Sequence, residues 1–291
     1  IHTAGLTNVE ECESNPDLAK EVNVDLAKNM AIACSNQCIK LVHISTDHIF
    51  SGNKELATEV RQPIPVNNYA RTKMLGEKEV LKYCKDAIIV RTNFFCWGTT
   101  YRKSFSDFIL KKLRNNEQVD LFSDIFFNPI LVDELSKRTH QLIDLNAKGV
   151  FNIVGSERMT KYAFGIKLAN FFNLDDSLIN QVSIDDRKNL VKRPKDMSLS
   201  NTKLCQTLNS KIASFDEQLQ TLKQQESNSV TNQLMLDIIP YGRHYIDEED
   251  IQAVVEVLRN GMLTQGPKIE EFEKKICNYV GAKYAVAVAN G

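Results

Sequence analysis

The stretch CIKLVHIST, residues 38–46, is a short run of apolar and β-branched side chains that ends in two hydroxyl residues. Runs of this kind suit a strand that is buried on both faces. A helical pattern precedes it in residues 15–37, and a second strand-like run, AIIVRTNFF, occupies residues 87–95. Strands that alternate with helices indicate βαβ units and a parallel sheet, in which ligands bind at the carboxyl ends of the strands.

Helical periodicity predicts which faces of the helices are buried. Beyond residue 100 helices and strands follow in a more mixed order, as expected for a smaller lobe packed on the sheet. Two apolar stripes are expected to face the core: Val22, Leu26, Met30 and Ala33 before the first strand, and Phe105, Phe108, Ile109 and Leu113 in the lobe.

The composition excludes several classes of protein. The 291 residues are 43% hydrophobic and 25% charged, and the formal net charge is −1. No basic excess exists to drive binding to nucleic acid or to an anionic membrane, so neither is expected as a partner. No apolar run approaches the roughly 18 residues that span a bilayer, and no signal peptide is recognisable. Seven cysteines without CxxC spacing indicate free thiols in a reducing cytoplasm, and no metal site is expected.

The composition changes near residue 224. Residues 224–233, QQESNSVTNQ, are polar and predict a linker without regular structure. Two helical patterns follow, with Asp247 and Gly261 as caps of the first and Pro267 in the first turn of the second. The last ten residues, AKYAVAVANG, are expected to begin a buried strand. The predicted domains are residues 1–224 (sheet part about 1–95, smaller lobe about 96–224), a linker at 225–234, and a second segment at 235–291.

NNYARTKMLGEK, residues 67–78, places Tyr69 and Lys73 four residues apart, on one face of a helix. A free tyrosine has a pKa of about 10, and a nearby ammonium lowers that pKa. Thr46, at the end of the first strand, can donate to the same carbonyl oxygen that Tyr69 protonates. The three groups suit reduction of a carbonyl by hydride from a nicotinamide. Alone, the YxxxK spacing is more typical of a surface turn, but the strands on either side favour catalysis.

The motifs HISTDHIFSG, YARTK, VRTNFF, FNPILVDEL and RPKDMSLSNTKL follow one another in this order. Together they resemble the extended short-chain dehydrogenase/reductases, and most closely the dTDP-4-dehydrorhamnose reductase branch, from residue 1 to about residue 224. The resemblance implies an α/β fold with a Rossmann-like, doubly wound parallel sheet and a smaller substrate-binding lobe. It implies NADP or NAD as cofactor, a nucleotide sugar as substrate, and a homodimer as a candidate assembly.

The resemblance also implies roles for individual residues. Tyr69 would be the acid, Lys73 its partner and a ligand of the cofactor ribose, and Thr46 the hydroxyl that orients the carbonyl. The remaining positions are Thr3, Ala4 and Gly5 beneath the cofactor, and Val9, His48 and Phe94 near the sugar. Relatives often have an aromatic residue in place of His48 and a tryptophan in place of Phe94, so the identity of the sugar stays open.

Some residues allow two interpretations. A sugar 4,6-dehydratase would have a glutamate where this chain has His48, so reduction is favoured over dehydration. His48 itself is either a substrate contact or a loop histidine satisfied by backbone groups. Asp47 could simply cap the loop. Asn23 resembles an asparagine that serves a proton relay in some of these enzymes, but a polar residue on a helix face is the simpler interpretation.

No glycine-rich turn of the GxGxxG or GxxGxxG type occurs in the chain. In this fold such a turn holds the pyrophosphate of the dinucleotide at a helix N-terminus. By resemblance it would precede residue 1, within roughly the first 50–60 residues of the domain. We therefore expect an incomplete sheet, and weak or no dinucleotide binding by the chain as given.

Residues 235–291 resemble the start of the sugar-nucleotide aminotransferases that use pyridoxal phosphate, and LTQGPKIEEFE is the most specific piece. The likeness is closest to the UDP-4-amino-4,6-dideoxy-N-acetyl-β-L-altrosamine transaminases. Pyridoxal phosphate is expected only for full-length relatives, because their Schiff-base lysine would lie beyond residue 291, and Lys283 is not that residue. Both resemblances point to nucleotide-sugar processing for surface polysaccharide. Three functions follow: a reductase, a non-catalytic reductase-fold binding or regulatory module, and a fused aminotransferase fragment.

Overall fold

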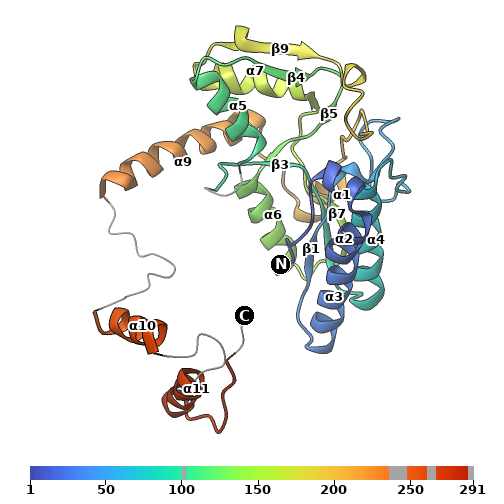
Figure 1. The fold of residues 1–291 in the computed structure, drawn as a ribbon. Helices are drawn as coiled ribbons and strands as arrows, with labels where there is room; N and C mark the ends of the chain where they lie inside the picture. The colour runs from blue at the N-terminus through green and yellow to red at the C-terminus, as the bar shows by residue number, and fades with distance from the viewer. Residues whose placement is uncertain (100–102, 236–247, 261–266, 288–291) are drawn as a thin grey trace. The chain divides into compact units, whose positions relative to one another are not determined.

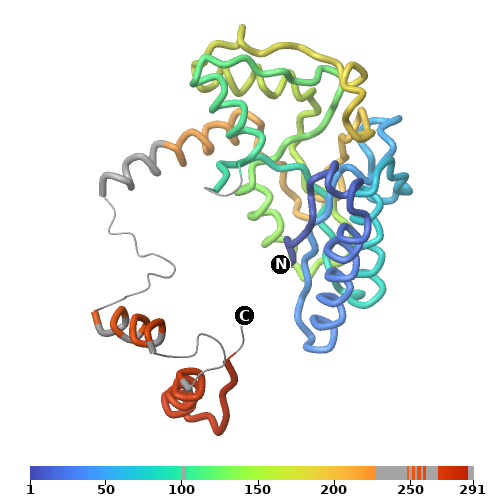
Figure 2. Tube along the Cα trace, in the orientation of Figure 1, coloured from blue at the N-terminus to red at the C-terminus, as the bar shows by residue number. Residues whose placement is uncertain are grey.

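The computed structural model describes residues 1–99, 103–235, 248–260 and 267–287 (Figure 1). The chain divides into two compact units, residues 1–232 and 233–291. Figure 2 follows the chain through both, from blue at the N-terminus to red at the C-terminus. The first unit contains a parallel sheet and a smaller lobe, whereas the described residues of the second form two helices.

The sheet part begins with short helices and alternates afterwards between strand and helix. Its elements are α1 (Val9–Ser14), α2 (Pro16–Lys20), a π-helical turn (Glu21–Asp25), α3 (Leu26–Asn36), β1 (Val42–Ile44), a 3-10 turn (Asp47–Ile49), α4 (Asn68–Tyr83), β2 (Ile88–Arg91), α6 (Val132–Asp144), β7 (Gly149–Asn152) and α8 (Thr202–Leu208).

The central sheet is parallel, in the order β1-β2-β7, and His2 forms an isolated parallel bridge to His43 on β1. Ile89 of β2 packs against α3 and α4, whereas Ile88 and Val90 pack against α6 and α8. Helices therefore cover both faces, with α3 and α4 side by side on one of them (Figure 1). This α/β arrangement confirms the predicted fold class, and it explains why β2 is apolar from Ile88 to Val90.

The buried face of the helix before β1 is not the predicted one. Ala27 and Ala31 are fully buried, whereas Leu26 and Met30 are 37% and 36% exposed. The π-helical turn adds a residue to one turn and so rotates the helix that follows it. Small residues fit there because α3 and α4 approach closely: a Cβ on Gly76 would lie 2.4 Å from a carbonyl oxygen of the π-helical turn.

The smaller lobe has its own core, centred on Phe164. The rings of Phe95, Phe127 and Phe215 lie 5.6, 5.6 and 5.7 Å from that of Phe164, centre to centre. The elements of the lobe are β3 (Phe94–Phe95), α5 (Phe105–Arg114), β4 (Val119–Phe122), β5 (Phe126–Phe127), β6 (Ile130–Leu131), β8 (Met159–Thr160), α7 (Lys161–Phe171), 3-10 turns (Asp176–Leu178 and Ile184–Asp186), β9 (Ile179–Val182) and α9 (Phe215–Met235).

Helix α5 begins with a capping box. The Ser104 hydroxyl accepts from the backbone N–H of Asp107, and the Asp107 carboxylate accepts from the backbone N–H of Ser104. The expected apolar side of this helix needs one correction, because Phe108 is 46% exposed and Leu110 is buried instead. Ile109 and Leu110 face the core, so Phe108 lies at the border of the buried face.

Helix α9 starts after Ser214, whose hydroxyl accepts from the backbone N–H of Glu217 at 3.3 Å, as predicted for an N-cap. It continues to Met235. Residues 224–233 are therefore helical, and the prediction that they lack regular structure is wrong. Glutamine and glutamate favour helix, and no glycine or proline interrupts this segment.

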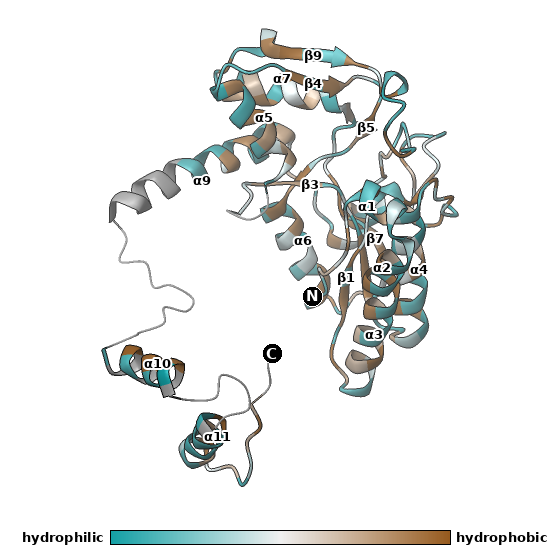
Figure 3. Ribbon diagram, in the orientation of Figure 1, coloured by the Kyte–Doolittle hydropathy of each residue, from teal (hydrophilic) through white to brown (hydrophobic). Residues whose placement is uncertain are grey.

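The second unit contains α10 (Glu248–Asn260) and α11 (Pro267–Val280), each amphipathic in Figure 3. Helix α11 begins at Pro267, as predicted, whereas the predicted caps of α10 lie outside the described residues. Residues 284–287 form no strand, and Tyr284 and Val286 are 76% and 80% exposed. The predicted buried strand is therefore wrong for these residues, because a strand needs a neighbour to satisfy its backbone groups.

All seven cysteines are free, as predicted. Cys12, Cys34 and Cys84 are buried, which is ordinary for thiols of this kind. Within the part of the chain that the structure describes, no helix combines the length and the apolar character needed to cross a bilayer.

Candidate active site

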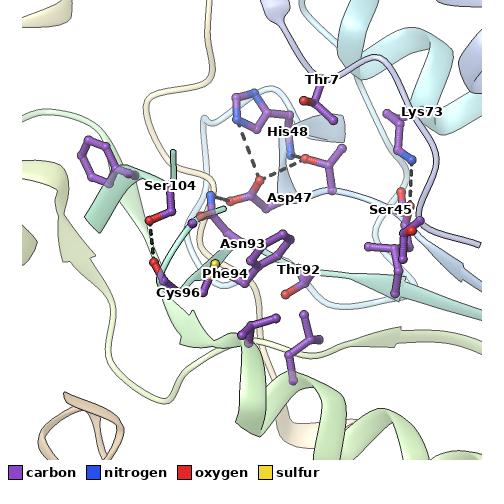
Figure 4. A pocket seen from close by; sticks show the side chains of 18 of the residues that line it. Thr7, Ser45, Asp47, His48, Lys73, Thr92, Asn93, Phe94, Cys96 and Ser104 are labelled. Atoms are coloured by element: carbon purple, nitrogen blue, oxygen red, sulfur yellow. Dashed lines mark hydrogen bonds and ion pairs between the residues drawn. The ribbon is translucent and has the colours of Figure 1, made fainter. Parts of the chain in front are cut away.

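A pocket of 730 Å³ opens at the carboxyl end of the central sheet. Ser45 and Thr46 follow β1, Thr92 and Asn93 follow β2, and all four line the pocket. Parallel strands bring these chain segments to one edge of the sheet, although they are far apart in sequence. Figure 4 shows how the side chains gather there.

The pocket brings together nearly all of the residues that the sequence singled out. Tyr69 and Lys73 contribute from α4, and Thr46 contributes from the loop after β1. Ala4 is not among the lining residues. The predicted residues that line the pocket are Thr3, Gly5, Val9, Thr46, His48, Tyr69, Lys73 and Phe94.

Local sequence explains how α4 presents its two polar residues. The side chain of Asn67 caps the helix by accepting from the backbone N–H of Ala70 at 2.9 Å. The helix therefore starts just before Tyr69, and Lys73 lies one turn later on the same face. The ammonium of Lys73 donates to the carbonyl oxygen of Ile44 at 2.7 Å, which ties the helix to the end of β1.

The charge of Lys73 is held in an unusual environment. Burial lowers the pKa of Lys73 to about 8, and the carboxylate of Glu77 opposes that change. Glu77 in turn accepts from the guanidinium of Arg91 at 2.8 Å and from the hydroxyl of Ser45. Sequence reasoning missed this network. Its one local clue was that Glu77 follows Lys73 by four residues and so continues the Tyr69–Lys73 face.

A second network surrounds Thr46. Its hydroxyl donates to Asp47 Oδ1 at 3.2 Å and accepts from the backbone N–H of His48 at 3.2 Å. The amide of Asn93 donates to Asp47 Oδ2 at 2.6 Å (Figure 4). The ring of His48 meets the ring of Tyr69 edge to face at 5.4 Å. Burial lowers the pKa of His48 despite the nearby Asp47 carboxylate, so the imidazole is neutral at physiological pH.

Asn23 is buried, and its side chain makes three hydrogen bonds. Its side-chain oxygen accepts from the backbone N–H of Leu6 at 2.9 Å. Its amide donates to the carbonyl oxygen of Leu6 at 3.0 Å and to the hydroxyl of Thr72 at 3.1 Å. These contacts use both amide hydrogens and join the pocket loop to α4.

Comparison with known families gives two matches. Residues 1–228 match the RmlD substrate binding domain, and residues 244–291 match the DegT/DnrJ/EryC1/StrS aminotransferase family. The first match covers more than half of the chain. Both agree with the two resemblances drawn from the sequence motifs.

Curated proteins with similar sequences include a reductase and an enzyme subunit. A probable low-salt glycan biosynthesis reductase of Haloferax volcanii is 29% identical over 199 residues, covering 67% of this chain and 66% of that protein. Methionine adenosyltransferase 2 subunit beta of Rattus norvegicus is 28% identical over 222 residues, covering 70% and 63%. The chain therefore spans about two thirds of the length of these relatives.

Solved structures share the fold. A dTDP-4-dehydrorhamnose reductase of Bacillus anthracis in complex with NADP matches with a TM-score of 0.72 at 26% identity. The match covers 77% of this chain and 79% of that one.

Proposed function

The chain belongs to the RmlD substrate-binding domain family, and from this premise we propose that it reduces the 4-keto group of a 6-deoxy sugar nucleotide. The observation that carries the proposal is one pocket lined by Thr46, Tyr69 and Lys73 together. The likeness to a glycan biosynthesis reductase and to a dTDP-4-dehydrorhamnose reductase supports the same chemistry. The proposed setting is biosynthesis of a surface polysaccharide.

The residues present fit the nicotinamide end of a dinucleotide. A Cβ on Gly5 would lie 3.1 Å from Asn23 Oδ1 and 3.8 Å from Lys73 Nζ, so a side chain there would fill part of the pocket. Lys73 uses one of its three donors on Ile44, which leaves two for a ribose. Thr3, Gly5 and Lys73 are therefore the residues that we propose would hold the cofactor, with NADP preferred because the relative of known structure contains it.

The bound nicotinamide would supply the hydride that reduces the keto carbon. Tyr69 then delivers its phenolic proton to the oxygen at which negative charge develops. The Lys73 ammonium favours the phenolate and so makes Tyr69 a stronger acid. Thr46 donates a hydrogen bond to the same oxygen, once its hydroxyl turns from Asp47 toward the substrate.

Replacement of the phenol tests this proposal directly. With dTDP-4-keto-6-deoxyhexose and NADPH, we expect Tyr69→Phe to lower kcat at least 100-fold, because proton transfer typically contributes a factor of 10² to 10⁴. The measurement is the loss of NADPH absorbance. Tyr83→Phe is the matched control, since Tyr83 ends the same helix and does not line the pocket. Equal and measurable rates for wild type and Tyr69→Phe would refute the assigned acid.

The same assay also tests a second function, that of a binding or regulatory module. The likeness to methionine adenosyltransferase 2 subunit beta, which is not named as a reductase, supports a binding or regulatory module with the reductase fold as the second function. In that case the nucleotide sugar or the dinucleotide would bind, as measured by calorimetry, and no turnover would follow.

A further inference from the structure

One buried hydroxyl in the wall of the pocket has no hydrogen-bond partner. Thr92 directly follows β2 and is buried, with 4% of its surface exposed. Its Oγ1 has no hydrogen-bond partner among the described residues. Thr92 lines the pocket, and Figure 4 shows its side chain among the others that do so. Such an atom calls for an explanation, because buried polar groups in native proteins nearly always have a partner.

Thr92 shares this property with one other residue of the pocket. Five buried side-chain atoms of the described residues lack a partner, and two of them belong to residues that line the cavity. These two atoms are Thr92 Oγ1 and His48 Nδ1. In the view of Figure 4, Asp47 and Asn93 lie between the two side chains. The pocket therefore contains hydrogen-bonding groups that the described part of the chain does not use.

The side chains on either side of Thr92 already have other partners. The guanidinium of Arg91 forms an ion pair with Glu77 at 2.8 Å. The amide of Asn93 donates to Asp47 Oδ2 at 2.6 Å. These contacts hold the chain in place before and after Thr92, and they leave its hydroxyl for a molecule that enters the pocket.

Thr92 and Thr46 occupy equivalent places on neighbouring strands. Ile44 of β1 pairs with Val90 of β2, and each threonine lies two residues beyond its member of this pair. The backbone N–H of Ser45 donates to the carbonyl oxygen of Val90 at 2.6 Å, so the pairing continues toward the pocket. Neighbouring strands lie about 4.8 Å apart. A ring-sized molecule bound beside Thr46 is therefore within reach of Thr92.

We propose that Thr92 is a ligand-binding residue whose hydroxyl hydrogen-bonds to a neutral polar group of the molecule bound beside Thr46. That group is a hydroxyl of the keto sugar or the carboxamide of the nicotinamide, both of which donate and accept hydrogen bonds. A neutral group fits because Val132 and Leu135 also line the pocket, and burying a charge among apolar side chains is costly. The identity of the ligand rests on the proposed function, but the missing partner of the hydroxyl does not.

Thr92→Val tests the missing partner without any ligand. We expect this variant to raise the urea midpoint of the full chain, because an unpaired buried hydroxyl costs stability and a methyl group does not. Thr139→Val is the matched control. Thr139 is buried and lines the same pocket, but its hydroxyl donates to the carbonyl oxygen of Leu135 at 2.8 Å, so its midpoint should fall. An unchanged or lower midpoint for Thr92→Val would mean that the hydroxyl is already satisfied in the folded chain, and would overturn the proposal.

Calorimetry then identifies the ligand. With dTDP-4-keto-6-deoxyhexose and NADPH titrated separately, we expect Thr92→Val to weaken the binding of one of them about tenfold, as loss of one hydrogen bond does. Weaker binding of the sugar nucleotide would assign the sugar hydroxyl, and weaker binding of NADPH would assign the carboxamide. Thr139→Val should bind both ligands as the wild type does. Unchanged affinity of Thr92→Val for both ligands, or a wild type that binds neither, would contradict the role of Thr92.

The turnover assay separates this role from the proposed function. If the wild type turns over and Thr92→Val binds both ligands equally well, the function stands and the role of Thr92 fails. If the wild type binds a ligand without turnover, the proposed function fails, and the affinity of Thr92→Val still decides the role of the hydroxyl.

Discussion

The two units of this chain contain equally regular amphipathic patterns, but the apolar side chains are buried in the first unit and exposed in the second. In the first unit every residue of β2 is buried, and helices cover both faces of the sheet. In the second, Val254 and Leu258 of α10 are 60% and 62% exposed, and Phe272 of α11 is 56% exposed. A periodic pattern is thus enough to place a helix, but burial of its apolar side requires a partner surface.

The largest expected difference lies between two phenylalanines. Phe164→Ala should lower the free energy of unfolding of the first unit by about 3–5 kcal/mol, because it empties the centre of the lobe core. Phe272→Ala should change the stability by less than about 0.5 kcal/mol, as for exposed positions generally. Urea unfolding followed by circular dichroism measures both. A cost of several kcal/mol for Phe272→Ala would remove the contrast between the units.

Two glutamates sharpen the comparison further. Glu77→Gln should destabilise the first unit by about 3 kcal/mol, because it leaves the buried guanidinium of Arg91 without its ion pair. Glu271 also makes an ion pair, with Lys275 at 3.0 Å, but both side chains are largely exposed. Glu271→Gln should therefore leave the unfolding midpoint unchanged. Equal unfolding midpoints for Glu77→Gln and Glu271→Gln would show that burial does not decide how much an ion pair contributes to stability.

The smallest expected effect is a gain in stability rather than a loss. Lys73→Met should stabilise the first unit by at most about 3 kcal/mol, since the folded pKa is about 8 and the ordinary value is 10.5. Below pH 8 both states hold the proton, so the wild type bears the full cost of the buried charge. Between pH 8 and 10.5 the folded state sheds that proton, and the advantage of the variant should disappear. Urea unfolding of the wild type and of Lys73→Met at pH 7 and pH 10 measures this difference in stability.

Lys275→Met is the control for this experiment. Lys275 is exposed, with 75% of its side chain accessible, so its replacement should not alter the pH dependence of unfolding. If Lys73→Met proved less stable than the wild type at pH 7, the hydrogen bond to Ile44 would outweigh the desolvation of the charge. Lys73→Met should also lose activity even if it is more stable than the wild type, because a residue placed for function is often unfavourable for stability.

Part of the fold and of the site was predictable because its causes are local. The alternation of strand and helix, the start of α11 at Pro267 and the shared face of Tyr69 and Lys73 follow from neighbouring residues. The errors arose where packing decides. Leu26 lies outside the core because a π-helical turn rotates α3, and residues 284–287 form no strand without a neighbour. Residues 224–233 extend a helix despite their polar composition.

The sequence by itself determined which elements form and that a phenol and an ammonium share one helix face, because backbone hydrogen bonds within a helix reach only four residues. Only the tertiary structure decided what surrounds them. Glu77 meets Arg91, and Asp47 meets Asn93, because separate segments pack against one another and exclude water. Charges at such distances in sequence interact strongly only after burial, which local patterns do not encode.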